Sequence, residues 1–295
     1  MTDEKLNNGT AVALGNFDGI HLGHSAVLEK TVEMSKDTLT ATVMLFDEHS
    51  LKAVSGEAPP MLMTDSERLE FLTQKGLRVR TVSFADIRSL SPEDFVKNIL
   101  VDRLNAKAVV CGFNYRFGKG ASGDAKLLKK LCKAENIECI TVDEVLCDSL
   151  PVSSTAIRKA IENGDIVLAN NMLGRAFGFG AVVVDGEKRG RTWGFPTINQ
   201  HLPDGLVVPR FGVYESRVTI DGKEYKGVTN IGKRPTVGTD TVLSETHIID
   251  FSGDLYGRDV FVSLIRFIRP EKKFSSFDKL ALQIKNDCLT VKGGV

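Results

Sequence analysis

The sequence predicts an α/β domain with a parallel sheet over residues 1–173, followed over 174–295 by a small antiparallel β-barrel with one terminal helix. Three observations support this division. The length of 295 residues corresponds to about two domains of roughly 150 residues each. Up to about Leu173, short apolar runs alternate with helical periodicity, which favours a doubly wound parallel sheet. After Arg175, short β-rich segments are separated by Gly, Asp and Pro, which is typical of a barrel.

In the first domain, apolar and partly β-branched runs predict buried parallel strands at 11–14, 38–46, 78–84, 108–112 and 137–142. Residues 64–67 (Thr-Asp-Ser-Glu) form a capping box, which predicts a helix that ends at Gly76. Ser91, followed by Pro92 and two acidic residues, predicts a second helix start.

In the second domain we expect strands at 181–184, 213–220, 226–231, 247–251 and 260–268. The pair Asp221-Gly222 between two β-rich runs predicts a hairpin turn. Phe277, Leu280 and Ile284 recur at helical spacing, so we expect a terminal helix over 275–288.

Composition excludes several classes of protein. Lys+Arg and Asp+Glu number 38 each, which disfavours nucleic acid as a main partner. The sequence has no run of about 18 apolar residues, so we expect no membrane span. The N-terminus also lacks a signal-peptide pattern, so we expect a cytoplasmic protein. The 5 cysteines show no CxxC spacing and are expected to be reduced, mostly buried thiols.

The most informative segment is the run 15–24, Gly-Asn-Phe-Asp-Gly-Ile-His-Leu-Gly-His, which follows a predicted strand and opens a helix. Its glycines allow close backbone approach to a ligand, and a helix N-terminus favours phosphate. His21 and His24 can donate hydrogen bonds to phosphate oxygens. Two alternatives are glycines that only form a tight turn and a histidine pair that binds metal. No nearby third ligand completes such a metal site.

The HxGH pattern resembles the nucleotidylyltransferase superfamily, which implies a Rossmann-like first domain. Three segments together, 15–24, 111–118 and 151–158, resemble the bacterial bifunctional riboflavin kinase/FAD synthetases. The resemblance implies that His21 and His24 are catalytic. It also implies nucleotide binding by Gly15, Phe17, Asp18, Gly19, Gly23, Asn114, Ser153, Ser154, Thr155 and Arg158. The alternative for the last four is an ordinary N-cap followed by a surface arginine.

One segment departs from the family pattern. The family has a Phe-x-Pro-His-Pro-like run after its second strand, but residues 46–50 read Phe-Asp-Glu-His-Ser, without either proline. In the family this segment is expected to contact flavin, so the missing prolines weaken the prediction of flavin contacts at Glu48 and His49. They also motivate the alternative of an impaired adenylyl transfer.

The second domain resembles riboflavin kinases at 190–199, 227–236, 245–251 and 266–274. The glycines Gly190 and Gly194 would form a mobile flap over the phosphates, or alternatively a simple β-turn. Thr197 and Asn199 point the same way on an extended segment and carry hard oxygen donors that suit magnesium (Mg²⁺). The resemblance implies that Glu245 is the general base, where the alternative is a residue that only begins an edge strand. It places Arg269 near bound flavin and ADP.

The implied function is bifunctional: riboflavin is phosphorylated by ATP to FMN, and FMN is adenylylated by ATP to FAD with release of pyrophosphate. No Walker GxxxxGK[ST] pattern is present, which excludes an ordinary P-loop kinase. One alternative is a riboflavin kinase with an impaired adenylyltransferase domain. Another is a flavin-binding protein without catalysis, which the presence of Thr197, Asn199 and Glu245 disfavours.

Overall fold

The computed structural model describes residues 8–36, 38–47, 58–186, 195–236 and 239–293, and the side chains of 234–240 are not described. The chain divides into two compact units. Unit 1 comprises 1–59 and 65–153, and unit 2 comprises 60–64 and 154–295.

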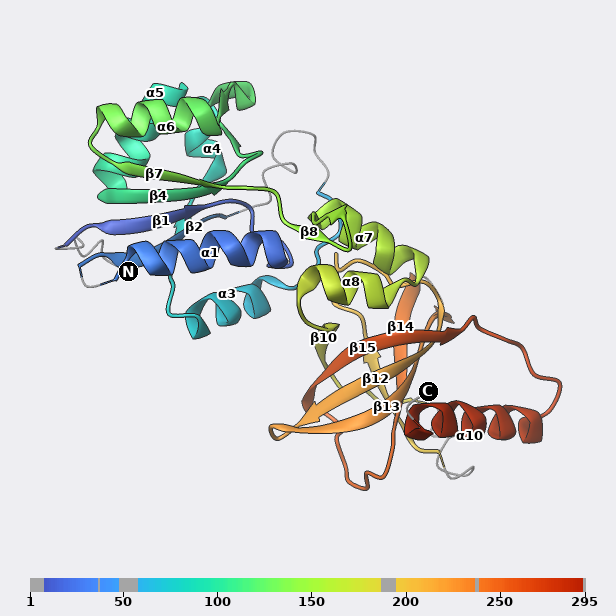
Figure 1. Cartoon of the computed structure of the whole chain (residues 1–295). Coiled ribbons are helices and arrows are strands. Elements are labelled where there is room, and N and C mark those ends of the chain that lie inside the picture. Colours follow the sequence, from blue (N-terminus) through green and yellow to red (C-terminus); the bar gives the residue numbers. More distant parts are fainter. Residues whose placement is uncertain (1–7, 37, 48–57, 187–194, 237–238, 294–295) are drawn as a thin grey trace. The chain divides into compact units, whose positions relative to one another are not determined.

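Unit 1 is built on a parallel sheet in the order β3-β2-β1-β4-β7 (Figure 1). The expected parallel strands are confirmed, with bounds shifted by a few residues. They are β1 (Thr10–Leu14), β2 (Thr40–Phe46), β3 (Arg78–Val82), β4 (Ala106–Gly112) and β7 (Glu138–Val142). The strand order reverses direction between β1 and β4, which makes this sheet doubly wound.

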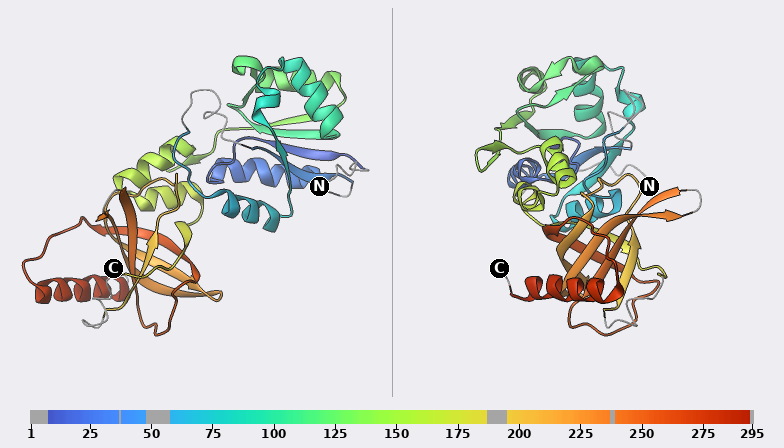
Figure 2. Two further views of the ribbon diagram at one scale, coloured as in Figure 1. Left: turned by 180° about the vertical axis from the view of Figure 1, so that it is seen from behind. Right: turned by 90° about the vertical axis from the view of Figure 1, so that its right-hand side faces the viewer.

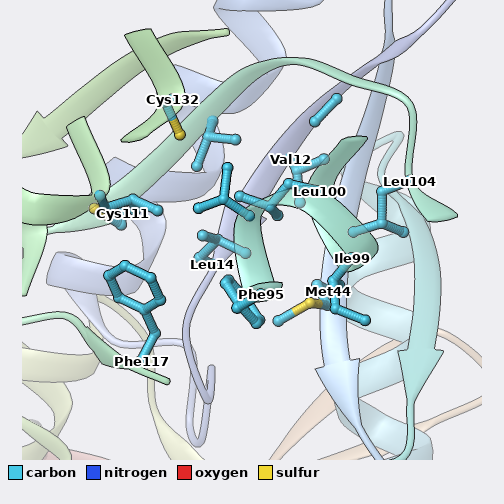
Figure 3. Close-up of a cluster of buried hydrophobic side chains, with 14 of the residues drawn as sticks. Val12, Leu14, Met44, Phe95, Ile99, Leu100, Leu104, Cys111, Phe117 and Cys132 are labelled. Carbon is cyan, nitrogen blue, oxygen red and sulfur yellow. The ribbon is translucent and has the colours of Figure 1, made fainter. Parts of the chain in front are cut away.

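Helices cover both faces of this sheet, and the views in Figures 1 and 2 agree on this arrangement. Helix α1 (Leu22–Met34) lies on one face, and α6 (Ala125–Ala134) lies on the other. Alternate strand residues therefore face opposite layers. Figure 3 shows Val12 and Leu14 of β1 packed with Phe95 and Leu100 in the core cluster on the α6 side.

The connections of unit 1 hold shorter elements. Helix α3 (Asp65–Gln74) begins at the predicted capping box, and Gly76 follows it with φ 76°. The remaining short elements are α4 (Phe84–Ile87), α5 (Pro92–Asp94), β5 (Arg116–Phe117), η2 (Lys119–Ala121), β6 (Gly123–Asp124), β8 (Leu146–Cys147) and β9 (Leu150–Pro151).

The predicted helix start at Ser91 is confirmed, but the helix itself differs from the expectation. The Ser91 hydroxyl accepts the backbone N–H of Asp94 at 3.0 Å, and Pro92 occupies the first turn. After this short α5, the chain continues as the π-helix η1 (Phe95–Arg103). Its buried residues Phe95, Val96, Ile99 and Leu100 belong to the core cluster. The wider turns of this π-helix therefore pack against the sheet.

Unit 2 begins with α7 (Ser154–Asn163) and α8 (Ile166–Leu173). Asn170 of α8 ties this helix to the sheet that follows, because its Nδ2 donates to the carbonyl of Leu264 at 2.9 Å. Its Oδ1 accepts the N–H of Phe177 at 2.7 Å. Residues 60–64 also pack here, since the carbonyl of Met61 accepts the N–H of Val207 at 2.8 Å.

The main sheet of unit 2 is antiparallel, in the order β10-β15-β12-β13-β14-β11 (Figure 1). Its strands are β10 (Phe177–Val182), β11 (Thr197–His201), β12 (Gly212–Ile220), β13 (Lys223–Thr236), β14 (Thr239–Ile248) and β15 (Asp259–Arg269). The edge strands meet where the N–H of Val184 donates to the carbonyl of Asn199 at 2.8 Å. The sheet therefore curls toward the expected barrel.

The Asp221-Gly222 hairpin is confirmed: Ile220 pairs with Lys223, and both turn residues have positive φ, at 51° and 75°. The terminal helix is also confirmed, as α10 (Phe277–Gly293).

Two expected strands are wrong in their bounds. The segment at 247–251 belongs to a strand that ends at Ile248, because Asp250 turns the chain with φ 57°. Strand β10 begins at Phe177, before the expected 181. Because Gly178 has no side chain, the chain can approach β15 closely enough to pair with it from this point. A Cβ at Gly178 would lie 2.5 Å from the carbonyl oxygen of Val262 on β15.

The interior of the barrel contains a buried hydroxyl network. The Thr229 hydroxyl lies 2.7 Å from that of Ser216 and 2.8 Å from that of Thr246, and all three residues are fully buried. Thr246 is next to Glu245 on β14, and successive strand residues point to opposite faces. The network therefore faces the barrel interior, while Glu245 faces outward.

We expect Thr229→Val to lower the free energy of unfolding by about 1–3 kcal/mol, because it leaves the hydroxyls of Ser216 and Thr246 without this partner. Thr229→Ser, which keeps the hydroxyl, and Thr219→Val, at a half-buried position of β12, serve as controls. Urea unfolding of unit 2, followed by circular dichroism, measures the difference. Equal stability of the Thr229→Val variant and the wild type would contradict a role of the network in stability.

Candidate active sites

The first site lies at the carboxyl edge of the parallel sheet. Leu14, the last residue of β1, pairs with Met44 of β2 and with Cys111 of β4. The residues that follow β1 and β4, Gly15 and Gly112, therefore leave the sheet side by side. This point is the topological switch, where ligands bind in open α/β sheets.

The turn 15–24 has a tight, partly strained backbone. Phe17, Gly19 and Ile20 have positive φ, at 51°, 75° and 39°. A Cβ at Gly15 would lie 3.2 Å from the ring of Phe17, and a Cβ at Gly23 would lie 3.2 Å from the ring of His21. The glycines thus let aromatic side chains fold closely against the turn.

The two histidines stack at the N-terminus of α1. His21 is the N-cap, and its Nδ1 accepts the backbone N–H of His24 at 3.2 Å. Neutral His21 therefore carries its proton on Nε2, where it can donate to a ligand. The two rings lie 3.7 Å apart with planes at 15°, and the ring of Phe17 lies 5.3 Å from His24.

His24 is held in its neutral form. Burial, and secondly the charge of His21, hold the pKa of His24 well below its usual value of 6.5. Its Nδ1 is buried and has no hydrogen-bond partner among the described residues. A neutral imidazole still donates one hydrogen bond, so His24 can act on a phosphate as a donor without carrying a charge.

The structure brings together only some of the residues predicted for this site. Asn114 follows β4 beside Gly112, at the same sheet edge as the turn 15–24. Ser153 ends unit 1, whereas Ser154, Thr155 and Arg158 lie on α7 of unit 2. The Nε of Arg158 donates to the carbonyl of Pro60 at 2.6 Å, also within unit 2. A phosphate-binding role of these residues stays a prediction.

The segment that departs from the family pattern is only partly described. Phe46 ends β2, and its ring lies 5.2 Å from that of Phe84. The carboxylate of Asp47 accepts the backbone N–H of Phe84 at 3.0 Å. Glu48 and His49 lie outside the described residues, so the prediction of flavin contacts there is untested.

The second site follows from the register of the antiparallel sheet. Asn199 of β11 pairs with Glu245 of β14, and Glu245 pairs in turn with Asn230 of β13. Beyond them, Asn230 pairs with Val213, and Val213 pairs with Arg269. Paired residues share a face, with Cβ atoms about 4.5–5.5 Å apart. The sheet therefore aligns Asn199, Glu245, Asn230 and Arg269 in one row.

Thr197 extends this row by one position along β11. It shares the face of Asn199 and pairs with His247, whose Nδ1 lies 2.8 Å from the carbonyl oxygen of Pro196. The ring of Phe195 lies 5.4 Å from that of His247. Gly190 and Gly194, predicted to form a flap, lie outside the described residues.

Arg269 anchors the terminal helix at the end of the row. Its Nη2 donates to Oδ2 of Asp287 on α10 at 2.8 Å, and its Nε lies 3.1 Å from the same oxygen. The Asp287 side chain is only 4% exposed, so the pair is largely shielded from solvent. Sequence reasoning missed Asp287, which lies 18 residues from its partner on a helical face that otherwise packs apolar residues.

Three further findings concern the described part of the chain. No group of three or more His, Cys, Asp or Glu side chains there is arranged to hold a metal ion. Thr197 and Asn199 carry hydroxyl and amide oxygens, which are not among these side chains. Among the same residues, no helix is both long enough and apolar enough to cross a membrane. The cysteines are free thiols, and Cys111, Cys132, Cys139 and Cys288 are buried, as expected.

Comparisons with known proteins give one family model for each half of the chain. The family model of FAD synthetase matches residues 3–156, and that of riboflavin kinase matches 173–293. The bifunctional riboflavin kinase/FMN adenylyltransferase of Escherichia coli K12 is 37% identical, over 96% of this chain and 92% of its own. The protein of the same description from Haemophilus influenzae is 36% identical, over 98% and 95%.

One solved structure resembles the whole chain. It is described as a macrolide-efflux protein from Streptococcus pneumoniae and is 33% identical, with a TM-score of 0.89 over 97% of this chain and 94% of that one. Two family models in series and full-length relatives above 30% identity lead to one conclusion. The chain belongs to the family of bifunctional riboflavin kinase/FMN adenylyltransferases.

Proposed function

We propose that the chain makes FAD from riboflavin in two steps. The riboflavin kinase activity transfers the γ-phosphoryl group of ATP to riboflavin, giving FMN and ADP. The adenylyltransferase activity transfers AMP from a second ATP to the FMN phosphate, giving FAD and pyrophosphate. The observation that carries this proposal is the presence of both family models in one chain, each over residues that hold a candidate site. The alternative of a kinase alone has less support, since the relatives from Escherichia coli and Haemophilus influenzae carry bifunctional names.

We also propose the domain boundary. The adenylyltransferase domain is assigned to residues 1–173 and the riboflavin kinase domain to 174–295. By their contacts, α7 and α8 belong to unit 2, which would put the boundary near residue 154. The riboflavin kinase family model begins at residue 173, which supports the later boundary, at 173/174. A protein that acts on soluble nucleotides and flavins suits the cytoplasm, which is the localisation we propose.

In adenylyl transfer, an oxygen of the FMN phosphate attacks the α-phosphorus of ATP. This oxygen is already ionised, so no protein base is needed. Charge develops on the departing pyrophosphate, and the N-terminus of α1 and the Nε2–H of His21 are suited to stabilise it. His24 donates as a neutral imidazole. The nucleotide is lined by Asn114 and by residues of the turn, namely Gly15, Phe17, Asp18, Gly19 and Gly23. Further phosphate donors are supplied by Ser153, Ser154, Thr155 and Arg158.

In the kinase reaction, Glu245 accepts the proton of the ribityl 5′-hydroxyl as that oxygen attacks the γ-phosphorus of ATP. Asn199, directly opposite Glu245, and Thr197, on the same face, carry the oxygen donors that would hold Mg²⁺. Magnesium bound there would neutralise charge on the ATP phosphates. Gly190 and Gly194 would let a flap close over these phosphates, and Arg269 would contact flavin and ADP from the end of the row.

The first test separates the two activities at His24. We expect His24→Ala to lower the rate of FAD formation from FMN about a hundredfold, because it removes a donor to the developing phosphate charge. FMN formation from riboflavin should stay near the wild-type rate. Both products are measured by chromatography on the same preparation, with His201→Ala, at an exposed histidine, as the control. Equal loss of both activities in a folded protein would contradict the assignment.

The complementary test uses Glu245. We expect Glu245→Ala to lower FMN formation from riboflavin about a hundredfold, since general-base catalysis contributes roughly 10²–10⁴. FAD formation from supplied FMN should be unchanged. Glu224→Ala, at an exposed position of β13, controls for the loss of a carboxylate. A full kinase rate in Glu245→Ala would rule out Glu245 as the base.

The lowered pKa of His24 predicts a pH-dependent stability. Above pH 6.5 both the folded and the unfolded chain keep His24 neutral, so it has no effect on stability there. Below pH 6.5 the unfolded chain binds a proton that the folded chain does not, so acidification destabilises the fold by at most about 1.4 kcal/mol per pH unit. Urea unfolding of unit 1 at pH 8 and pH 5.5 should therefore show a larger loss for the wild type than for His24→Gln. Identical losses would contradict a lowered pKa of His24 in the folded chain.

A further inference from the structure

A second element, helix α3, is hydrogen-bonded to the turn 15–24. Arg68 of α3 donates from Nη1 to the backbone carbonyl of Asn16 at 3.2 Å, across 52 positions of sequence. From Nη2 it donates to Oδ1 of Asp65 at 2.6 Å. The guanidinium group therefore joins the start of α3 to the turn between β1 and α1, within unit 1.

The surroundings of Arg68 are unusual for a surface ion pair. Its side chain is only 18% exposed, whereas that of Asp65 is 78% exposed, so solvent screens the carboxylate far more than the guanidinium. Its Nε is buried and has no hydrogen-bond partner among the described residues. Leaving a buried donor unsatisfied is unfavourable, which argues that the guanidinium has a role besides its pairing with Asp65.

The turn has a clear need for an external anchor. Phe17 and Ile20, both fully buried, have positive φ at 51° and 39°, a region that bulky residues rarely adopt. Strained backbone of this kind persists only where the surrounding structure holds it. Asn16 directly precedes the first strained residue, so a hydrogen bond to its carbonyl acts where the turn departs from the strand.

We propose that Arg68 is a positioning residue for adenylyl transfer. It holds the carbonyl of Asn16 and thereby fixes the orientation of the turn that carries His21 and His24. This inference rests on the proposed adenylyltransferase function of unit 1. Because Arg68 acts on the turn, its loss should lower the rate of the reacting complex more than the affinity for ATP.

The test uses Arg68→Met, which keeps an unbranched apolar stem and removes both donors and charge, and Arg68→Lys, which keeps the charge without the planar fork. Lys75→Gln, just beyond the other end of α3, is the matched control for charge. Steady-state rates of FAD formation from FMN and of FMN formation from riboflavin are measured on each protein, together with its melting temperature.

We expect kcat for FAD formation to fall about 10- to 100-fold in Arg68→Met, the range for loss of a hydrogen bond from a charged group. Arg68→Lys should lose about tenfold, because one ammonium cannot replace the fork at both Asn16 and Asp65. In both variants the KM for ATP should stay within about twofold, because the hydrogen bonds of Arg68 are to the protein itself. The kinase rate should equal that of the wild type, and Lys75→Gln should be unchanged throughout.

Three results would overturn the proposal: wild-type kcat in both Arg68 variants, a rise in the KM for ATP with kcat unchanged, or a parallel fall of both activities with the melting temperature. The second would indicate direct binding of ATP by Arg68, and the third a purely structural role. If the wild type itself made no FAD from FMN, the proposed function would fail, and this inference with it. FAD formation by the wild type with unaffected variants would contradict the role of Arg68 alone.

Discussion

Strand register brings together several residues of each candidate site that are far apart in the sequence. In unit 1, Leu14 pairs with Cys111, so the turn after β1 and the loop after β4 begin at adjacent points of one sheet edge. In unit 2, the pairing of Asn199 with Glu245 puts an amide and a carboxylate on one face of the barrel wall. A slip of one residue in β14 would turn Glu245 into the interior, where Thr246 now belongs to the hydroxyl network. Each site therefore depends on the same contacts that hold its sheet together.

The two sites differ in the protonation chemistry that their surroundings support. The ring of His24 is partly buried and stacks on that of His21. Burial of the ring, and secondly the charge of His21, lower the pKa of His24 and suit it to donate a hydrogen bond as a neutral group. Adenylyl transfer to a phosphate that is already ionised has no need of a base. Glu245 is half-buried on the outer face of the barrel, where an alcohol substrate must lose a proton. The chemistry of each proposed acceptor, a phosphate or a hydroxyl, thus matches the side chain beside it.

Much of this arrangement could be predicted from the sequence, because it depends on local patterns. The β1 strand, the glycine–histidine turn and the Asp221-Gly222 hairpin each have a short-range signal in residue type and spacing. The family resemblance added the candidate residues and the order of the two domains. Contacts between distant segments have no such signal. The bonds from Arg68 to Asn16 and from Arg269 to Asp287 depend on how helices pack, as do the π-helix after Asp94 and the early start of β10 beside β15.

The central claim is that one chain carries both activities, and a product assay tests it most directly. Purified protein is incubated with ATP and magnesium, with riboflavin in one tube and FMN in a second, and the flavins are separated by chromatography. The account predicts FMN and FAD in the first tube and FAD in the second. FMN alone in the first tube, with no FAD in the second, would contradict it and leave a riboflavin kinase whose N-terminal unit lacks adenylyltransferase activity.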